Sequence, residues 1–173
     1  PLGALTDVVA GDSRCGPAID MARRMHPQPD KGIIVRDDSR ADNMLGIELS
    51  RILEAPLLPI AADLVPDAVL DYLNQLQPSE IIILGSSNEF RRGILDSFAL
   101  RYADAKVTIL EDERKDLLAL KAYRYATEQS DAWGRTAFLS YKECFEDLLV
   151  LSPYMYAIEA PLFFVETQHT VDA

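Results

Sequence analysis

The chain has 173 residues, 49% of them hydrophobic, and its 28 acidic and 17 basic side chains give a formal net charge of −11. This composition predicts a well-filled globular fold, and no apolar run approaches the roughly 18–20 residues of a membrane helix. The acidic balance argues against nucleic acid as a partner, because phosphates require a basic surface. Two cysteines and two histidines provide neither a disulfide framework nor a zinc site, so Cys15 and Cys144 are interpreted as small core residues.

Short β-branched runs alternate with amphipathic stretches along the chain, which is typical of an α/β fold. The runs are nearly continuous in apolar residues, as expected for strands that are buried on both faces of a parallel sheet. In chain order, the predicted strands are 7–10, 32–36, 56–60, 80–84, 106–110, 136–140 and 162–165.

The segments between these strands carry apolar residues at helical spacing, which predicts helices with one buried face. The three clearest stripes are Leu45/Leu49/Ile52/Leu53, Val69/Tyr72/Leu73/Leu76 and Phe90/Ile94/Leu95/Phe98. Strands and helices in this alternation favour a parallel, Rossmann-like (Toprim-like) sheet flanked by helices.

An internal repeat is found when the sequence is compared with itself at an offset of 105 residues. Residues 32–68 and 137–173 then align without a gap, and both contain the tetrapeptide Glu-Ala-Pro-Leu. Each copy is predicted to form a strand, an acidic loop, a helix and a second strand that opens with Ala-Pro. Proline suits that place, since it ends the helix and can occupy a first strand position.

The period of about 100 residues fits a domain-sized unit better than a solenoid repeat. The second copy ends at Ala173, where the first continues into another helix and further strands. We therefore expect a fragment of a longer protein in tandem repeat units, with a first unit over 1–110 and a partial second unit over 111–173. No charged-then-apolar leader opens the chain, so we expect any export signal to have been removed or to lie outside it.

The ordered series of short motifs resembles the cell wall-binding repeat type 2 family of Gram-positive surface proteins. The first unit carries Gly11-Asp12-Ser13-Arg14 at a predicted helix start, a Ser-x-x-Asp loop, Ala55-Pro56-Leu57-Leu58, and Ile81-Ile82-Ile83-Leu84-Gly85. The second carries Phe145-Glu146-Asp147-Leu148-Leu149 and Glu159-Ala160-Pro161-Leu162. For the helix that opens the second unit, we prefer a start at Arg114 over the family-like string at Arg124-Tyr125-Ala126-Thr127.

The resemblance implies a secreted, non-catalytic module without a cofactor that acts at the cell surface. Such a module would hold its protein non-covalently on the cell wall by contacting an anionic secondary polymer. It also implies that three units complete a module around a pseudo-threefold axis, so that the partners would include further repeat units. A chain with fewer units would expose an interface and form homo-oligomers.

A ligand of an open α/β sheet binds in the crevice beyond the carboxyl ends of the strands. Two loops of the first unit leave neighbouring strands there, over residues 36–42 and 85–92, and they offer charged and neutral hydrogen-bonding groups. The predicted polymer-binding residues are Arg36, Asp37, Ser39, Ser86, Ser87, Asn88, Arg91 and Arg92. Arg91 and Arg92 stand out because the helix dipole disfavours cations in a first turn.

Plainer interpretations of the same residues remain open. Asp42 and its counterpart Asp147 are expected to cap the helices that they precede, and residues 85–88 fit an ordinary βα turn. Asp37 and Asp38 could hold Mg²⁺ for phosphoryl transfer, which with Ser86 would make a small hydrolase or phosphotransferase, although no triad histidine supports it. A structural or adhesive spacer is the third alternative.

Overall fold

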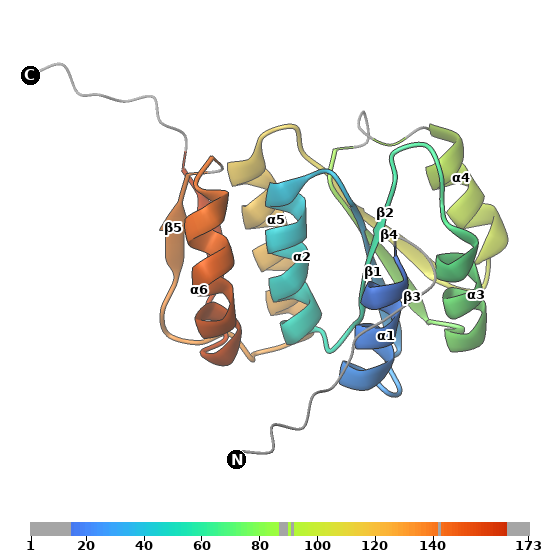
Figure 1. Ribbon diagram of the computed structural model, residues 1–173, viewed down its shortest axis with the longest axis horizontal. Coiled ribbons are helices and arrows are strands. Elements are labelled where there is room, and N and C mark those ends of the chain that lie inside the picture. The colour runs from blue at the N-terminus through green and yellow to red at the C-terminus, as the bar shows by residue number, and fades with distance from the viewer. Residues whose placement is uncertain (1–14, 87–89, 91, 142, 166–173) are drawn as a thin grey trace, which may run out of the picture.

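The computed structural model describes residues 15–86, 90, 92–141 and 143–165 (Figure 1). Helices and strands alternate along this part of the chain, and no helix within it is both long and apolar enough to span a bilayer. In chain order the elements are α1 (Gly16–Met25), β1 (Lys31–Arg36), α2 (Arg40–Ile52), β2 (Leu57–Ile60), α3 (Asp67–Leu76), β3 (Glu80–Leu84), α4 (Arg92–Arg101), β4 (Lys106–Leu110), α5 (Lys115–Gln129), β5 (Phe138–Ser140), α6 (Phe145–Ala157) and β6 (Leu162–Phe164).

A four-stranded parallel sheet in the order β2-β1-β3-β4 forms the centre of the molecule, and β5 and β6 form a second, two-stranded parallel sheet. The predicted α/β fold with a parallel sheet is therefore confirmed. Six of the seven predicted strands are present with ends shifted by two residues or fewer, and the seventh, 7–10, lies outside the described residues.

The prediction that every strand is buried on both faces is wrong for the edge strands. The central strand β3 is buried along its whole length, whereas β4 and β5 keep partly or fully exposed side chains. A strand at an edge has a neighbouring strand on one side only, which leaves its side chains more open to solvent than those of a central strand.

Helices cover both faces of the four-stranded sheet, and alternate side chains of β1 show the division. Ile34 points into a core formed with α1, α3 and α4, whereas Ile33 and Val35 point into a core formed with α2 and α5. This second core continues past α2 and α5 to side chains of α6 and β6. Helix α2 therefore packs on the four-stranded sheet on one side and on α5 and α6 on the other, and its Glu48 reaches the start of β6 (Figure 1).

The 105-residue repeat is present in the backbone. Helix α2 at 40–52 and α6 at 145–157 coincide at that offset, and the pairing of Ile33 with Leu57 recurs as Phe138 with Leu162. Both helices end in the same turn: Glu54 and Glu159 have left-handed φ angles of 50° and 57°. In both turns the amide of the next residue, an alanine, donates to a carbonyl five residues earlier, as in a Schellman motif. The predicted repeat is therefore confirmed over the described residues of the second copy.

The helix that we expected to open a second unit begins at the predicted place. Arg114 occupies the N-cap position of α5, and Arg124 lies in the middle of that helix. The two cysteines form no disulfide; Cys15 is buried as predicted, whereas Cys144 is only half-buried at the N-cap of α6.

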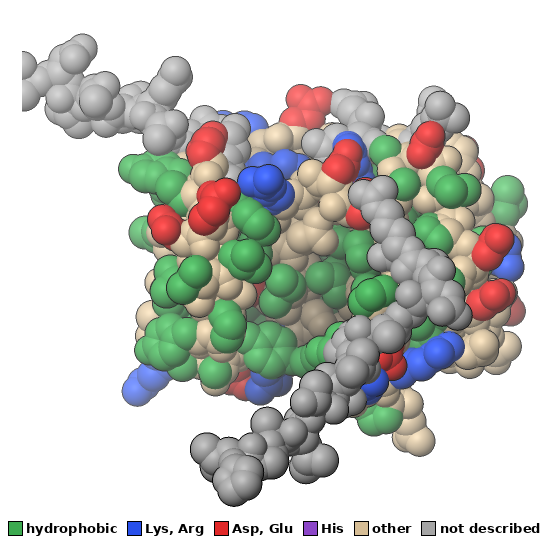
Figure 2. All heavy atoms as spheres, viewed as in Figure 1, with side chains coloured by type: hydrophobic (Ala, Val, Ile, Leu, Met, Phe, Trp, Pro, Cys, Tyr) green, Lys and Arg blue, Asp and Glu red, His purple; other side chains and the backbone are tan. Residues whose placement is uncertain are grey.

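Large apolar side chains are exposed more often in the second copy than in the first. Figure 2 shows hydrophobic side chains gathered over α6 and around the hollow between α6 and α1. Leu149, Val150 and Tyr154 of α6 are 56%, 79% and 59% exposed, whereas the equivalent Met44, Leu45 and Leu49 of α2 are at most 2% exposed. Each of these residues occupies the same position along its helix as its equivalent in the other copy. The difference in exposure therefore comes from the elements that pack against each helix.

Candidate functional site: the carboxyl edge of the sheet

The carboxyl ends of β1, β3 and β4 meet at one edge of the four-stranded sheet, at the top of Figure 1. Val35 of β1 pairs with Leu84 of β3, so Arg36 and Gly85 begin neighbouring loops. Helix N-termini follow both loops, as they do in ligand-binding crevices of open α/β sheets. The structure therefore brings the loops at 36–42 and 85–92 together as predicted, to the extent that their residues are described.

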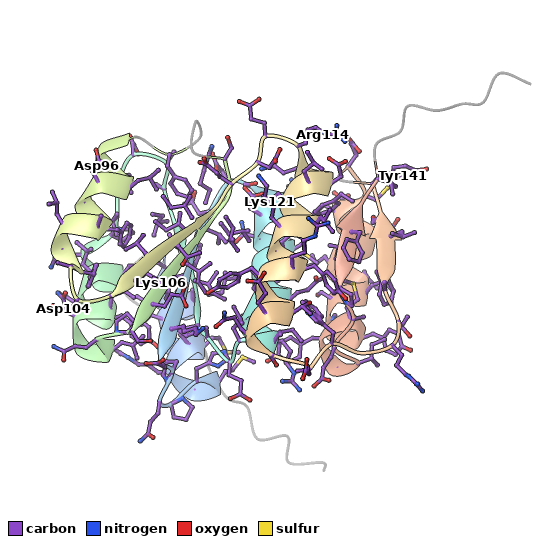
Figure 3. All side chains as sticks on the ribbon, turned by 180° about the vertical axis from the view of Figure 1, so that it is seen from behind. Asp96, Asp104, Lys106, Arg114, Lys121 and Tyr141 are labelled. Carbon is purple, nitrogen blue, oxygen red and sulfur yellow. The ribbon has the colours of Figure 1, made fainter. Side chains whose placement is uncertain are left out.

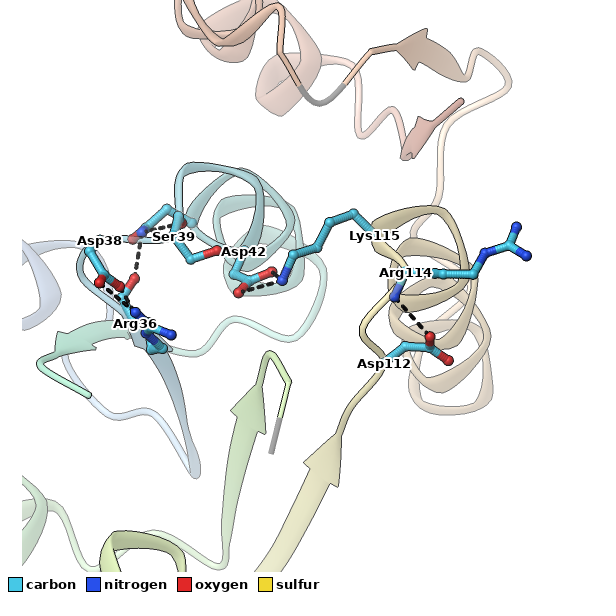
Figure 4. Close-up of polar contacts among 8 residues, drawn as sticks. Arg36, Asp38, Ser39, Asp42, Asp112, Arg114 and Lys115 are labelled. Atoms are coloured by element: carbon cyan, nitrogen blue, oxygen red, sulfur yellow. Dashed lines mark hydrogen bonds and ion pairs between the residues drawn. The ribbon is translucent and has the colours of Figure 1, made fainter. Parts of the chain in front are cut away.

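The loop between β1 and α2 is fixed by its own polar groups. The guanidinium of Arg36 makes two hydrogen bonds to the carboxylate of Asp38, one of them 2.8 Å long. The Asn43 amide donates to the carbonyls of Arg36 and Ser39, both at 2.7 Å, and the Asp37 amide donates to the Ile60 carbonyl at 2.9 Å. Ser39 occupies the N-cap position, although its side chain makes no capping bond. The Arg36 charge is thus engaged within the loop (Figure 4).

Asp42 is not the helix cap that its place in the sequence suggested. It lies three residues after the Ser39 N-cap, in the first turn of α2, and its side chain is fully buried. The Lys115 ammonium, 73 residues away in sequence, donates to both Asp42 oxygens at 2.8 and 3.1 Å (Figure 4). A buried carboxylate requires such a partner, because burying an uncompensated charge costs several kcal/mol.

Gly85 lies directly against this ion pair. A Cβ atom placed on Gly85 would lie 3.2 Å from Asp42 Oδ2, and the glycine has a φ of +143°, which side-chain-bearing residues rarely adopt. Asp42 therefore contacts the β3–α4 loop on one side and α5 on the other. The sequence did contain a signal for Lys115: it stands in the first turn of α5, where the helix dipole disfavours a cation.

Further cations at this edge are also paired with acids. Arg114 bonds the carboxylate of Asp116, and Lys121 bonds Asp112 at 2.8 Å and the Glu111 carbonyl at 2.6 Å. The hydrogen bond from Lys121 lowers the pKa of Asp112, and the bond from Arg114 lowers that of Asp116. Figure 3 shows Arg114 and Lys121 on α5 near the carboxyl end of β4, with Lys106 at the opposite end of that strand.

The predicted site residues differ in how they are presented. Arg36, Asp37 and Ser39 are half-buried, and Ser86 is 4% exposed, so its hydroxyl is not presented to solvent. Ser87, Asn88 and Arg91 lie outside the described residues; Arg92 opens α4, and its side chain also lies outside them.

A magnesium site at Asp37 and Asp38 gains no support from the geometry. Asp38 is bound by the Arg36 guanidinium, and in the part of the chain that the structure describes no three acidic, histidine or cysteine side chains cluster in a way that could hold a metal ion. The second copy has Tyr141 at the position of Arg36, so the ion pair of Arg36 with Asp38 is not repeated there.

The chain matches no protein-family model and no curated protein sequence. Its fold is similar to that of Cwp6 from Clostridium difficile, with a TM-score of 0.79, 17% sequence identity and 96% of this chain covered. It is also similar to Cwp8 from the same organism, with a TM-score of 0.79, 19% identity and 95% coverage. The chain spans 27% and 28% of those two chains, and at such identities the likeness establishes the fold.

Proposed function

We propose that the chain is part of a non-catalytic cell wall-binding module that holds a surface protein on the wall by non-covalent contact with an anionic secondary polymer. The observation that carries the proposal is the repeated β–α–β element, found in a fold shared with the cell wall proteins Cwp6 and Cwp8. The family resemblance of the sequence motifs points the same way and supports a location at the cell surface.

The charge pattern of the carboxyl edge limits where an anion could bind. Arg36, Lys115 and Arg114 each contact an acid of the same edge, so a polymer contacting them would have to compete with Asp38, Asp42 and Asp116. We therefore assign the charge-assisted contacts to Arg92, the first residue of α4, and to Arg91, which precedes it in the sequence, with Ser87 and Asn88 as neutral donors and acceptors. Arg36, Asp37, Ser39 and Ser86 would shape the floor of the contact.

We also propose further repeat units as partners of this chain. The outer face of α6 exposes Leu149, Val150 and Tyr154, whose equivalents on α2 are buried in a core shared with α5, α6 and β6. An apolar groove of about 510 Å³ lies beside it, between α1, α2 and α6. A further unit packed on α6 as α6 packs on α2 would cover this face, and without one, copies of the chain are expected to associate.

The polymer contact is tested with a binding isotherm on purified Gram-positive cell walls, before and after their secondary polymers are stripped. The double variant Arg91→Ala/Arg92→Ala should weaken binding by about two to four orders of magnitude, since charge-assisted hydrogen bonds contribute about 1.5–3 kcal/mol each. The matched control, Arg101→Ala/Arg124→Ala, removes two exposed arginines away from this edge and should bind as the parent chain does. Equal binding by both double variants, or binding that survives stripping, would contradict the proposal.

The unit interface has its own test, because it does not depend on the polymer. Sedimentation should show the parent chain self-associating at micromolar concentration and Val150→Glu as a monomer with an unchanged circular dichroism spectrum. A parent chain that stays monomeric at high concentration would argue against an open interface on α6.

A further inference from the structure

A buried carboxyl group lies where the two copies meet. Glu48, on the face of α2 toward the second copy, is 8% exposed, and its Oε2 accepts the amide hydrogen of Leu162 at 2.7 Å. Leu162 is the first residue of β6, so a side chain of the first copy binds the backbone of the second across 114 residues of sequence. This bond ties β6 to α2.

The other half of the Glu48 carboxyl has no protein partner in the described structure. Its Oε1 is buried without a hydrogen bond, and so is Nε1 of Trp133, from the segment between α5 and β5. Glu48 and Trp133 line the same cavity of about 10 Å³, whose remaining walls come from α2, α5 and the start of β6. That is about the space of one water molecule, and buried polar atoms of this kind are normally satisfied by water.

The surroundings of the carboxyl favour its neutral form. Burial raises the pKa of Glu48 to about 8, and the hydrogen bond from the Leu162 amide acts in the opposite direction. The cavity lining has one other titratable group, the Tyr123 phenol of α5. The charged groups that cross this junction are paired with each other: Arg51 of α2 with Glu159, at 2.6 Å, and Arg40 with Glu146 of α6.

We propose that Glu48 is a proton-controlled latch between the two repeat copies, closed while its carboxyl is protonated and weakened when it ionises. In the closed state Oε2 accepts from Leu162, and the Oε1 hydroxyl and the Trp133 indole both donate to one internal water. Ionisation leaves a buried negative charge opposite apolar walls, with a backbone amide as its protein donor and no counter-ion among the described residues. The free-energy cost of this buried charge weakens the contact between α2 and the second copy.

The sign of the effect follows from proton linkage. In the unfolded or undocked chain the carboxyl ionises near 4.5, and in the docked chain near 8, so the docked state binds one more proton in between. The contribution of Glu48 is complete below about pH 4.5 and is lost as the pH rises through 8. Each pH unit in that window lowers the docked-to-undocked ratio up to tenfold.

Trp133 is the single tryptophan of the chain, and its fluorescence reports on this junction directly. Urea unfolding of the full chain, followed by Trp133 emission between pH 5 and 9, should show a midpoint that falls toward pH 8 and then levels off. Glu48→Gln keeps the shape and the acceptor for Leu162 but cannot ionise, so its midpoint should change much less over the same window. The control Glu128→Gln, an exposed glutamate of α5, should follow the parent chain.

Parallel midpoint curves for the parent and Glu48→Gln would overturn the proposal, because other titrating groups such as His26 are common to both. Should Glu48→Gln fail to fold, carbon-13 spectra of the parent chain decide. The latch is supported if one glutamate carboxyl titrates near pH 8 and not in the range that is usual for glutamate. Titration of all glutamates below pH 6 rules it out.

Discussion

The segments β1–α2–β2 and β5–α6–β6 share a backbone but differ in what surrounds them. Helix α2 packs on the four-stranded sheet on one side and on α5, α6 and β6 on the other, whereas the outer face of α6 is open. Equivalent side chains consequently differ in burial: Asp42 is fully buried, and Asp147 is exposed. The comparison shows that the local sequence specifies which secondary-structure element forms. The elements packed against it determine which of its residues are buried and contribute to stability.

The largest expected difference lies between these two aspartates. Asp42→Asn should lower the free energy of unfolding by about 3 kcal/mol, because it removes the buried partner of Lys115. Asp147→Asn loses a favourable interaction with the helix dipole and should cost under about 0.5 kcal/mol. Urea unfolding measures both, and Lys115→Met completes a double-mutant cycle with Asp42→Asn. Equal costs for the two aspartates would mean that the ion pair is not formed in solution.

Gly46 and Leu151 are the next equivalent pair. A Cβ atom on Gly46 would lie 2.6 Å from Leu57 Cδ1 and 3.0 Å from Val35 Cγ1, and in the second copy Ser140 replaces Val35. Gly46→Leu should therefore destabilise the chain by about 2–3 kcal/mol through overpacking, and Leu151→Gly by about 1 kcal/mol through helix propensity.

Adding Val35→Ser to Gly46→Leu reproduces the combination of the second copy and should recover part of the loss in thermal unfolding. A double variant that is less stable than both single variants would show that the two copies do not share this packing solution.

The amino edge of the four-stranded sheet carries a buried acid, Glu80, with Lys31 at 3.2 Å and Lys106 at 2.9 Å. Burial raises the pKa of Glu80, but hydrogen bonds from Thr108, Lys106 and Lys31 outweigh it and lower the pKa to about 2. The stabilisation is complete above about pH 4.5 and is lost as the pH falls toward 2. Between pH 5 and 2 the parent chain should lose about 1–3 kcal/mol more than Glu80→Gln.

Circular dichroism in urea at each pH measures this acid effect. Because the network joins β1, β3 and β4, acid should loosen the four-stranded sheet, while the emission of Trp133, between α5 and β5, changes later. The assignment of this acid effect to Glu80 would be refuted if the circular dichroism signal and the Trp133 emission were lost together in both the parent chain and Glu80→Gln.

The smallest expected effects concern the two helix ends. Glu54 and Glu159 both adopt left-handed φ angles, which cost an L-residue about 1–2 kcal/mol. Glu54→Gly should stabilise the chain by about 0.5–1 kcal/mol, and Glu159→Gly should be close to neutral because it also loses the contact with Arg51. Differential scanning calorimetry measures the unfolding temperature of both variants. A lower unfolding temperature for Glu54→Gly would contradict the claim that the left-handed backbone of Glu54 is strained.

The fold was largely predictable because its signals are local. Apolar runs located β3 and β4 to the residue, and the ungapped offset of 105 predicted that the second copy repeats the strand–helix–strand element of the first. The polar core was not predictable in this way. Asp42 meets Lys115 where α2 packs against α5, and Glu48 meets Leu162 where α2 contacts β6. A carboxylate on a helix looks the same in sequence whether it caps, faces solvent or is buried.

Helix α2 has a consequence for the order of events during synthesis. Its outer face is covered by α5, α6 and β6, which leave the ribosome after the four-stranded sheet is complete. At roughly 5–20 residues per second, the stretch from Leu110 to Phe164 takes roughly 3 to 10 s to make. For that time a nascent chain carries Met44, Leu45 and Leu49 without their cover, a waiting period in which an apolar helix is open to chaperones or to a neighbouring nascent chain.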